Sequence, residues 1–324
     1  MAEIRETLEN RQVSIYLAAV IIGTAIAMTI PGTTMLEAWI NPALAFMLFV
    51  TFLQVPIGEL GQAFSKFRFL GVLLLTNFVA VPVLVGILVQ FLPVDPMIRL
   101  GVLLVLLAPC IDYVVTFSHL GRADAKLLLA ATPALLVVQM VLLPIYLSVF
   151  LGQEAADLVQ IGPFLHAFVW LIALPLILAV LTQSWAARSR MGTSVSARLG
   201  LMPVPATAIV LFIVAAAVVP QMGDAIDAAV RVVPVYVAFA IAAPLLGWFV
   251  ARLFRLDATA GRAVAFSSAT RNSLVVLPLA LAVPGAVPIL PAIIVTQTLV
   301  ELVSELVYVR LAPRFGVSTS PQIS

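Results

Sequence analysis

Charged residues are scarce in this chain. Of its 324 residues, 10% are Asp, Glu, Lys or Arg, whereas about a quarter of an ordinary soluble domain is charged. Hydrophobic residues make up 63% of the sequence, and the mean hydropathy is +1.18. This balance excludes an ordinary soluble protein and is typical of a chain that folds in a lipid bilayer.

Cysteine and catalytic motifs are also scarce. Cys110 is the single cysteine, which excludes an intrachain disulfide. The sequence has no nucleotide-binding Gly-rich loop, no cluster of metal ligands, and no nucleophile with a spaced histidine and acid. We therefore expect no enzyme, no cofactor and no nucleic-acid partner. Any transport would be driven by an ion gradient or be passive.

Long apolar runs are what the sequence has instead. Ten runs, separated by charges or by Pro/Gly turns, have the length of transmembrane helices. They cover residues 13–30, 38–56, 68–92, 97–119, 124–151, 158–183, 203–220, 228–251, 259–283 and 288–312. Because the runs do not alternate in polarity, we predict an all-α membrane protein with ten transmembrane helices rather than a barrel.

The basic residues predict the orientation. With a cytoplasmic N-terminus, 14 of the 17 Lys and Arg residues fall on the inside, Arg99 and Arg231 fall outside, and Arg271 lies within a span. This asymmetry predicts that both termini are cytoplasmic, in the inner (plasma) membrane of the cell. No cleavage site follows the first apolar run, so we expect no signal peptide.

The spans suggest a duplication. Five spans in each half would give the halves opposite orientations, and the segments 78–86 (FVAVPVLVG) and 239–247 (FAIAAPLLG) are a weak internal echo. We predict one membrane domain of two inverted five-helix repeats, about 13–151 and about 158–312, with a seam at 152–157. Spans 3–5 and 8–10 would form a core, and spans 1, 2, 6 and 7 a panel against which it moves.

The fourth and ninth runs are interrupted at their centres. The first interruption, LLAPCIDYVVTFSHLG at 106–121, contains Pro109, which removes a backbone donor and disfavours helix just before it. The second, FSSATRNSLVVLP at 266–278, contains Arg271 in apolar surroundings. Freed backbone groups are tolerated at membrane depth only inside protein or beside a water-filled cavity. We predict that the two helices cross near the midplane and form the working site.

Arg271 needs a partner in such a place. An arginine at the bilayer centre costs about 2.5–3.5 kcal/mol or more. Asp112 lies at a similar depth in the other interrupted helix, so we predict that the two charges approach each other, directly or through water. The pair could be a fixed part of the crossing or could act in gating or coupling, and the sequence leaves both open.

Two acids lie on one face of the last helix, Glu301 and Glu305. Glu301 is the deeper of the two, and we interpret it as a proton-titrating or site-lining group. A carboxyl that is hydrogen-bonded to a neighbouring helix is the alternative. For Glu305, nearer the cytoplasmic end, we expect solvation or pairing with Arg310.

Further polar candidates surround the breaks. Cys110 follows the helix-breaking proline, where a thiol could bind a soft solute such as trivalent arsenic or antimony. A buried cysteine is otherwise a small hydrophobic residue. The remaining candidates would bind solute or cap half-helices, and they are Asn77, Thr116, Ser267, Thr270, Asn272 and Ser273.

Short motifs resemble the bile acid:sodium symporter superfamily and, within it, the arsenite efflux permeases of the arsenical-resistance type. APCIDYV (108–114) and HLGRAD (119–124) are similar, without a gap, to the permeases' Ala-Pro-Cys-Thr-Ala-Met-Val and Tyr-Leu-Thr-Lys-Gly-Asp. This resemblance places Cys110 on the family's arsenite-associated cysteine. Leu299-Val300-Glu301 also resembles a Leu-Val-Glu piece of the family's last span.

The ninth span departs from both groups of relatives. The permeases have Ser-Ser-Asn-Asn-Phe-Glu, whose glutamate matters for activity, and Leu274 stands at that position. The sodium-coupled relatives have Glu-x-x-x-Gln-Asn-Ser, whose glutamate and glutamine help to bind sodium, and Ser267 and Arg271 replace these two. A fixed positive charge there argues against sodium coupling at that site. Asp112 replaces a small residue, as a counter-ion would.

The resemblance implies a secondary active transporter for efflux of arsenite or antimonite in exchange for protons. Cys110 would contact the solute, Asp112 or Glu301 would titrate, and Arg271 would hold the crossing or tune a carboxylate. The partners would be the lipid bilayer, a small solute (a metalloid hydroxide or an organic anion) and protons, while the oligomeric state stays open.

Two other functions also stay open. The first is a sodium-independent carrier of a small organic anion, for which Arg271 is a natural carboxylate partner. The second is a non-transporting membrane sensor or scaffold. The concentration of polar residues at mid-membrane favours transport over this last alternative.

Overall fold

The computed structural model describes residues 2–54, 67–111, 113–152, 166, 169–221 and 225–316. In these ranges the chain is built of helices, and its β-type pairing is one isolated antiparallel bridge between Pro109 and Arg271. The prediction of an all-α membrane protein is therefore confirmed for the described part of the chain.

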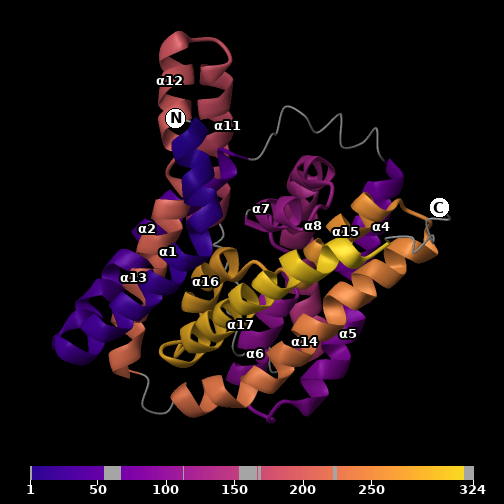
Figure 1. Cartoon of the computed structure of the whole chain (residues 1–324). Helices are drawn as coiled ribbons and strands as arrows, with labels where there is room; N and C mark the ends of the chain where they lie inside the picture. Colours follow the sequence, from indigo (N-terminus) through magenta and orange to yellow (C-terminus); the bar gives the residue numbers. More distant parts are fainter. Residues whose placement is uncertain are drawn as a thin grey trace.

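Helices make up most of the described part of each of the ten predicted runs (Figure 1). The first five runs contain α1 (Ala2–Thr29), η1 (Thr33–Leu36) with α2 (Glu37–Phe52), α4 (Phe67–Leu75) with η3 (Thr76–Ala80), α5 (Val81–Leu88) and η4 (Val89–Phe91), α6 (Pro96–Leu106) with α7 (Tyr113–Leu120), and α8 (Ala125–Leu151). The last five contain η5 (Val169–Ala173) with α11 (Leu174–Ala186), α13 (Pro203–Val218) with η6 (Val219–Gln221), α14 (Ala225–Leu253), α15 (Ala258–Ala269) with α16 (Ser273–Leu281), and α17 (Ile289–Leu311), which η7 (Ala312–Arg314) follows. The start of the sixth run and most of the predicted seam lie outside the described residues.

Fewer helices than the ten predicted spans are long enough to cross a membrane. Among the described residues, seven helices are long and apolar enough to cross a membrane, or eight if the bent pair α12 (Arg190–Leu199) and α13 is one span. The interrupted pairs α6/α7 and α15/α16 do not pass this test of length. The chain is thus a multi-pass membrane protein, while ten crossings and two inverted repeats stay predictions.

The helix α12 is one that the apolar runs did not predict. It lies between the runs 158–183 and 203–220, and Arg190, Arg198 and several hydroxyl side chains make it too polar for a span. Ser189 caps the helix, since its hydroxyl accepts a hydrogen bond from the Gly192 N–H at 3.5 Å. With α11 it forms a helical hairpin at one end of the molecule (Figure 1).

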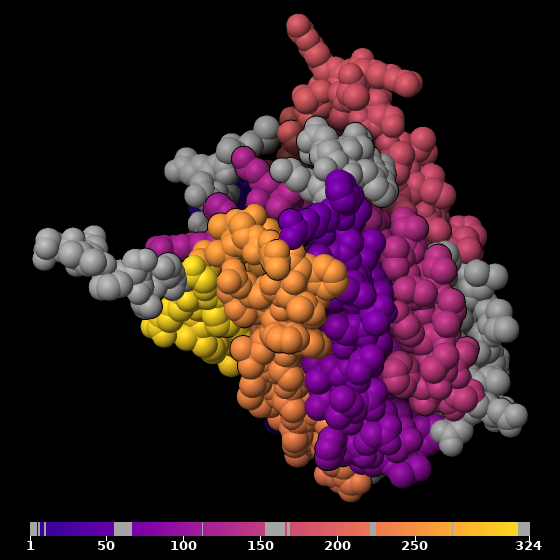
Figure 2. Space-filling view, turned by 90° about the vertical axis from the view of Figure 1, so that its right-hand side faces the viewer, coloured from indigo at the N-terminus to yellow at the C-terminus, as the bar shows by residue number. Residues whose placement is uncertain are grey.

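Three helices carry rows of exposed apolar side chains at four-residue spacing, which places each row on one helix face. The rows are Leu75, Val79, Val83 and Ile87 on α4–α5, Val137, Val141, Ile145 and Val149 on α8, and Val237, Ile241, Leu245, Phe249 and Leu253 on α14. Figure 2 shows α14 in orange, α4–α5 in purple and α8 in magenta side by side. An apolar surface of this extent is typical of a membrane-facing side.

The helices pack in two groups. One group contains α1, α2, α11 and α13, which contact one another, and the other contains α4–α8 and α14–α17 (Figure 1). The groups touch where α2 meets α16 and where α13 meets α17. The structure shows one conformation and therefore does not test whether one group moves against the other. The division into a moving core and a panel stays a prediction.

Acidic caps begin the helices that follow the turns. Asp95 at α6, Asp124 at α8 and Asp257 at α15 each accept hydrogen bonds from backbone N–H groups of the first turn. The bond from the Ala260 N–H, at 2.9 Å, and that from the Thr259 hydroxyl, at 2.7 Å, lower the pKa of Asp257. These capping side chains fix where the three helices begin.

The two interrupted spans are also joined away from their breaks. Arg262 of α15 donates to the carbonyl oxygens of Arg122, at 2.9 Å, and of Phe315, at 2.9 and 3.1 Å. The Asp124 N–H donates to the Thr259 carbonyl oxygen at 3.1 Å. The end of α7, the beginning of α15 and the segment after α17 are therefore held together.

Gly247 tests the close packing of α14 on α15. A Cβ at this position would overlap Ser268 Oγ and lie 3.0 Å from Ala265 Cα, whereas a Cβ at Gly71 would meet open space. We expect Gly247→Ala to lower the free energy of unfolding by roughly 1–3 kcal/mol, and Gly71→Ala to leave it unchanged or slightly raised. Unfolding of the purified proteins in detergent measures both. Equal stability of the two variants would contradict the packing.

Candidate functional site at the crossing of the interrupted helices

The fourth and ninth runs are interrupted and cross, as the sequence predicts. α6 ends at Leu106 and α7 begins at Tyr113, while α15 ends at Ala269 and α16 begins at Ser273. The extended residues between these ends run antiparallel to each other. The crossing therefore brings four helix ends to one place.

Backbone hydrogen bonds join the two breaks. The Cys110 N–H donates to the Thr270 carbonyl oxygen at 3.1 Å, and the Asn272 N–H donates to the Ala108 carbonyl oxygen at 2.8 Å. A helix break in a membrane frees such groups, and no water reaches them in the hydrocarbon core. The backbone groups of each break thus serve as hydrogen-bond partners for backbone groups that the other break leaves unpaired.

Arg271 is fully buried at the crossing. Its Nη2 donates to Asn77 Oδ1 at 2.9 Å and to the Ser267 carbonyl oxygen at 2.5 Å. Its Nη1 donates to the Leu106 carbonyl oxygen at 3.3 Å, and the guanidinium carbon lies 5.5 Å from the centre of the Phe239 ring. Ser267 and Leu106 lie in the last turns of α15 and α6, whose C-terminal dipoles favour a cation.

The predicted pairing of Arg271 with Asp112 is not tested, since Asp112 lies outside the described residues. Among the described side chains, no carboxylate forms an ion pair with the guanidinium, and Nε has no hydrogen-bond partner. Neutral oxygens and an aromatic ring therefore provide the contacts that the described part of the chain makes with this cation.

Glu301 binds three donors from three elements. Its Oε2 accepts from the Arg271 backbone N–H at 2.7 Å and from Gln297 Nε2 at 2.5 Å. Its Oε1 accepts from the Tyr113 hydroxyl at 2.5 Å. A carboxyl hydrogen-bonded to neighbouring elements was one of the two interpretations of this residue, and this geometry favours it.

The expectation for Glu305 is wrong. Its side chain is fully buried rather than solvated, and no ion pair with Arg310 is present among the described residues. Glu305 Oε1 lies 2.5 Å from the Thr270 hydroxyl oxygen. The break in the ninth span places Thr270 against α17, one helical turn along that helix from Glu301, so Glu305 reaches the crossing instead of the membrane surface.

Most of the other candidates also lie at the crossing. Asn77 Nδ2 donates to Ser267 Oγ at 3.0 Å. Asn272 caps α16, since its Oδ1 accepts from the Val275 N–H at 3.2 Å, and the Ser273 hydroxyl donates to the Gln297 side-chain oxygen at 2.5 Å. These side chains hold helix ends together in the present conformation.

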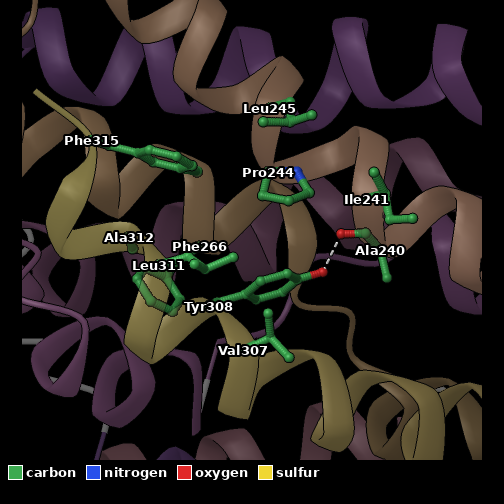
Figure 3. A pocket seen from close by; sticks show the side chains of 11 residues that line it. Ala240, Ile241, Pro244, Leu245, Phe266, Val307, Tyr308, Leu311, Ala312 and Phe315 are labelled. Carbon is green, nitrogen blue, oxygen red and sulfur yellow. Dashed lines mark hydrogen bonds between the residues drawn. The ribbon is translucent and has the colours of Figure 1, made fainter.

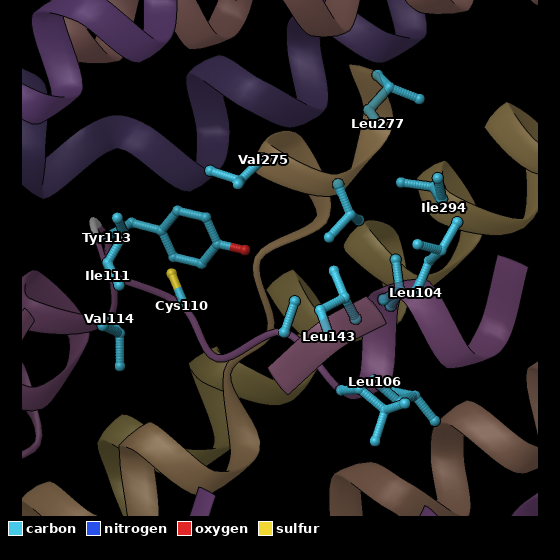
Figure 4. Close-up of a cluster of buried hydrophobic side chains, with 14 of the residues drawn as sticks. Leu104, Leu106, Cys110, Ile111, Tyr113, Val114, Leu143, Val275, Leu277 and Ile294 are labelled. Carbon is cyan, nitrogen blue, oxygen red and sulfur yellow. The ribbon is translucent and has the colours of Figure 1, made fainter. Parts of the chain in front are cut away.

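Cys110 has its side chain fully buried. In Figure 4 its sulfur points toward Tyr113 and lies among the aliphatic side chains that surround the break, such as Ile111 and Val114. A solute can contact this thiol only after the crossing opens.

Thr116 lies apart from the crossing, in a cavity of about 260 Å³. The cavity lies between α1, α2, α7 and α8, and its lining includes Arg5, Glu9, His119 and Ile111. Arg5 Nε and Glu9 Oε1 form an ion pair at 2.7 Å. Because Ile111 follows Cys110 directly, the cavity ends one residue from the thiol.

A second, apolar cavity of about 300 Å³ lies between α14, α15 and α17 (Figure 3). The Tyr308 hydroxyl donates to the Ala240 carbonyl oxygen at its edge. Tyr308 also lines a cavity of about 10 Å³ that reaches Glu301. The Tyr308 ring thus separates the apolar cavity from the crossing.

Sequence reasoning assigned no role to Tyr113, Gln297 or His119. A signal for Gln297 is present, because Gln297, Glu301 and Glu305 follow one another at four-residue spacing on one face of α17. Tyr113 and His119 carry no comparable signal, since a single aromatic or imidazole side chain in an apolar run is ordinarily a packing residue.

The fold and the crossing define a class of protein. Apolar helices, two of them broken and joined at mid-span by polar groups, are the architecture of secondary membrane transporters. Residues 41–227 match the model of the Sodium Bile acid symporter family. Since this match covers more than half of the chain, the protein belongs to that family of membrane transporters. A search among curated proteins finds no match.

The family assignment confirms the superfamily that the short motifs resemble. The matched region contains the first break, with Cys110, and ends before Arg271, Glu301 and Glu305. The arsenite permease subtype stays a prediction, and the roles of the residues in the second half rest on their geometry.

A double-mutant cycle tests the bond between Arg271 and Asn77. Arg271→Met leaves buried oxygen atoms without a donor, so we expect a loss of about 1–3 kcal/mol in the free energy of unfolding. Combined with Asn77→Leu, it should cost less than the sum of the single changes, by roughly 0.5–3 kcal/mol.

The matched control replaces Gln90, an exposed amide near the end of the same predicted span. Gln90→Leu should be additive with Arg271→Met when unfolding is followed in mixed detergent micelles. Additivity of Asn77→Leu as well would mean that the hydrogen bond contributes nothing to stability.

Proposed function

We propose that this transporter exports a trivalent metalloid hydroxide, arsenite or antimonite, in exchange for protons. It would lie in the inner (plasma) membrane with both termini in the cytoplasm. The observation that carries the proposal is the position of the single thiol. Cys110 lies in the first break, and its N–H is hydrogen-bonded to the carbonyl oxygen of Thr270 in the second. The Cys110 thiol therefore changes position whenever the two breaks move relative to each other.

The chemistry of one thiol suits transport. Trivalent arsenic and antimony are soft and bind thiolates, but a single sulfur ligand binds them weakly enough for release. The solute would enter the cavity beside Thr116 and His119, which extends to Ile111. Contact with the sulfur then requires that the antiparallel bridge opens, because the Cys110 side chain is buried in the present conformation.

Arg271 supports a transporter that does not use sodium at the crossing. Asn77 Oδ1 and the carbonyl oxygens of Ser267 and Leu106 converge on its guanidinium. Oxygen atoms of these types are ligands for hard cations, and here the side chain itself supplies the cation. An inorganic cation would have to displace a fixed positive charge.

A carrier of a small organic anion is the second candidate. The cavity between α1, α2, α7 and α8 favours it, because Arg5 and His119 line a space of about 260 Å³. A substrate carboxylate could replace Glu9 as the partner of Arg5. The chemistry of this cavity, and not the thiol, would then select the cargo.

Cys110→Ser tests the first candidate. In everted vesicles we expect this change to reduce arsenite accumulation at least about tenfold, equivalent to about 1.4 kcal/mol, because a hydroxyl is a poor ligand for a soft metalloid. Val141→Ala, on the lipid-facing row of α8, is the control and should transport normally. Arsenite transport that Cys110→Ser leaves unchanged would contradict the role of the thiol. Thermal protection of the protein by a carboxylate but not by arsenite would favour the organic anion.

Replacement of sodium by choline tests the role of Arg271. We expect solute flux in vesicles of the wild-type protein to be the same with either cation outside, because the guanidinium occupies the oxygen atoms at the crossing. Flux that rises in proportion to external sodium would show that sodium binds elsewhere or displaces the side chain.

A further inference from the structure

The Thr270 hydroxyl lies between two oxygen atoms. It is 2.8 Å from the Phe266 carbonyl oxygen and 2.5 Å from Glu305 Oε1. All these groups are buried, and the second oxygen of Glu305 has no hydrogen-bond partner among the described residues. Two oxygen–oxygen contacts within hydrogen-bond distance therefore meet at one hydroxyl.

A count of hydrogens assigns the donors. A hydroxyl has one hydrogen to donate, whereas a carbonyl oxygen can only accept. If Thr270 donates to Phe266, the contact between Thr270 and Glu305 needs a hydrogen from the carboxyl. Both contacts are hydrogen bonds only when Glu305 is protonated.

Glu301, one turn away on α17, has the opposite arrangement. The Arg271 N–H and the Gln297 amide both donate to Oε2 of Glu301, and such N–H groups can only donate. The Tyr113 hydroxyl lies 2.5 Å from Oε1 and 3.2 Å from the Arg271 carbonyl oxygen, so its single hydrogen can serve either. Among the described residues Glu305 has no N–H donor. The two N–H donors favour a carboxylate at Glu301, and their lack favours a neutral carboxyl at Glu305.

The groups that face Glu305 are consistent with this assignment. Glu301 and Tyr308 lie on its own helix, and Thr270 faces it from the break of the ninth span. No cation among the described residues forms an ion pair with Glu305. Arg271, next to Thr270 in the chain, donates its backbone N–H to Glu301.

We propose that Glu305 is a proton-carrying site and that Thr270 links its protonation to the position of Cys110. The inference rests on the proton-coupled transport proposed above. Thr270 holds Glu305 through its hydroxyl and the Cys110 N–H through its carbonyl oxygen. One residue therefore contacts both the acid and the thiol-bearing break.

Proton release changes these bonds in a defined way. The O–H bond of Glu305 breaks, its electron pair stays on the carboxylate, and the proton passes to water once the crossing opens. The Thr270 hydroxyl then turns its hydrogen from the Phe266 carbonyl oxygen to the carboxylate. Proton exchange and movement of the first break thus require the same opening of the crossing.

Infrared spectroscopy of the purified full chain at neutral pH tests the site without any cargo. A buried protonated carboxyl gives a carbonyl stretch that a carboxylate lacks. We expect the wild-type band to be lost or reduced in Glu305→Gln and kept in Glu301→Gln. A band that Glu305→Gln leaves at full intensity, or that Glu301→Gln removes, overturns the proposal.

Thr270→Val provides a variant that keeps the glutamate. It removes the acceptor of the Glu305 proton with little change in shape, so the band should persist at a shifted frequency. Thr298→Val on α17, whose hydroxyl bonds to the Ile294 carbonyl oxygen in its own helix, is the matched control and should not shift it. An unshifted band in Thr270→Val also overturns the proposal.

Arsenite flux in everted vesicles tests the coupling. A Gln at position 305 imitates the protonated acid, so Glu305→Gln should still exchange labelled for unlabelled arsenite but lose the stimulation by a pH gradient. Retained stimulation contradicts the coupling. If the wild-type protein moves no arsenite, the proposed cargo fails, while the infrared result still decides whether Glu305 carries the proton.

Discussion

A helix that breaks in a lipid bilayer leaves backbone groups that water cannot reach, and the structure is organised by the need to pair them. The two breaks pair with each other through Cys110 and Asn272, and the Arg271 N–H is paired by a carboxylate from α17. The carbonyl oxygens of Leu106 and Ser267 accept from the Arg271 guanidinium. Neither interrupted helix could keep its shape without the other, so the crossing is one cooperative unit.

In the described part of the crossing, the charges do not form a simple ion pair. The guanidinium lies at the C-terminal ends of α6 and α15, where helix dipoles and carbonyl oxygens favour a cation. Glu301 is bound to the backbone of Arg271 and not to its side chain. The guanidinium of Arg271 and the carboxyl group of Glu301 thus stabilise the same break from two sides. A change at Glu301 or Glu305 would alter the contacts of Arg271 or Thr270, which lie in that break.

The sequence predicts the helices and the crossing well, because apolar length, Pro109 and an intramembrane arginine have direct physical consequences. It also predicts that Asn77, Ser267, Thr270, Asn272 and Ser273 gather at the breaks. It does not predict α12, whose polar face hides it from a search for apolar runs. It wrongly places Glu305 at the cytoplasmic end of its helix. Counting residues along α17 gives the depth of Glu305 but does not show that Thr270, in the break of a neighbouring span, lies at the same depth. Thr116 lies in a separate cavity for a similar reason, since the arrangement of α1, α2 and α8 around α7 determines its surroundings.

α7 and α15 are fastened to each other at both of their ends. At one end the antiparallel bridge joins the breaks, and at the other Arg262 binds the Arg122 carbonyl oxygen while the Asp124 N–H binds that of Thr259. Two half-helices joined in this way cannot change the angle between them without breaking one of the joints. While the bridge is closed they move as one rigid unit, so any rotation within this group of helices must then be taken up by the other half-helices, α6 and α16.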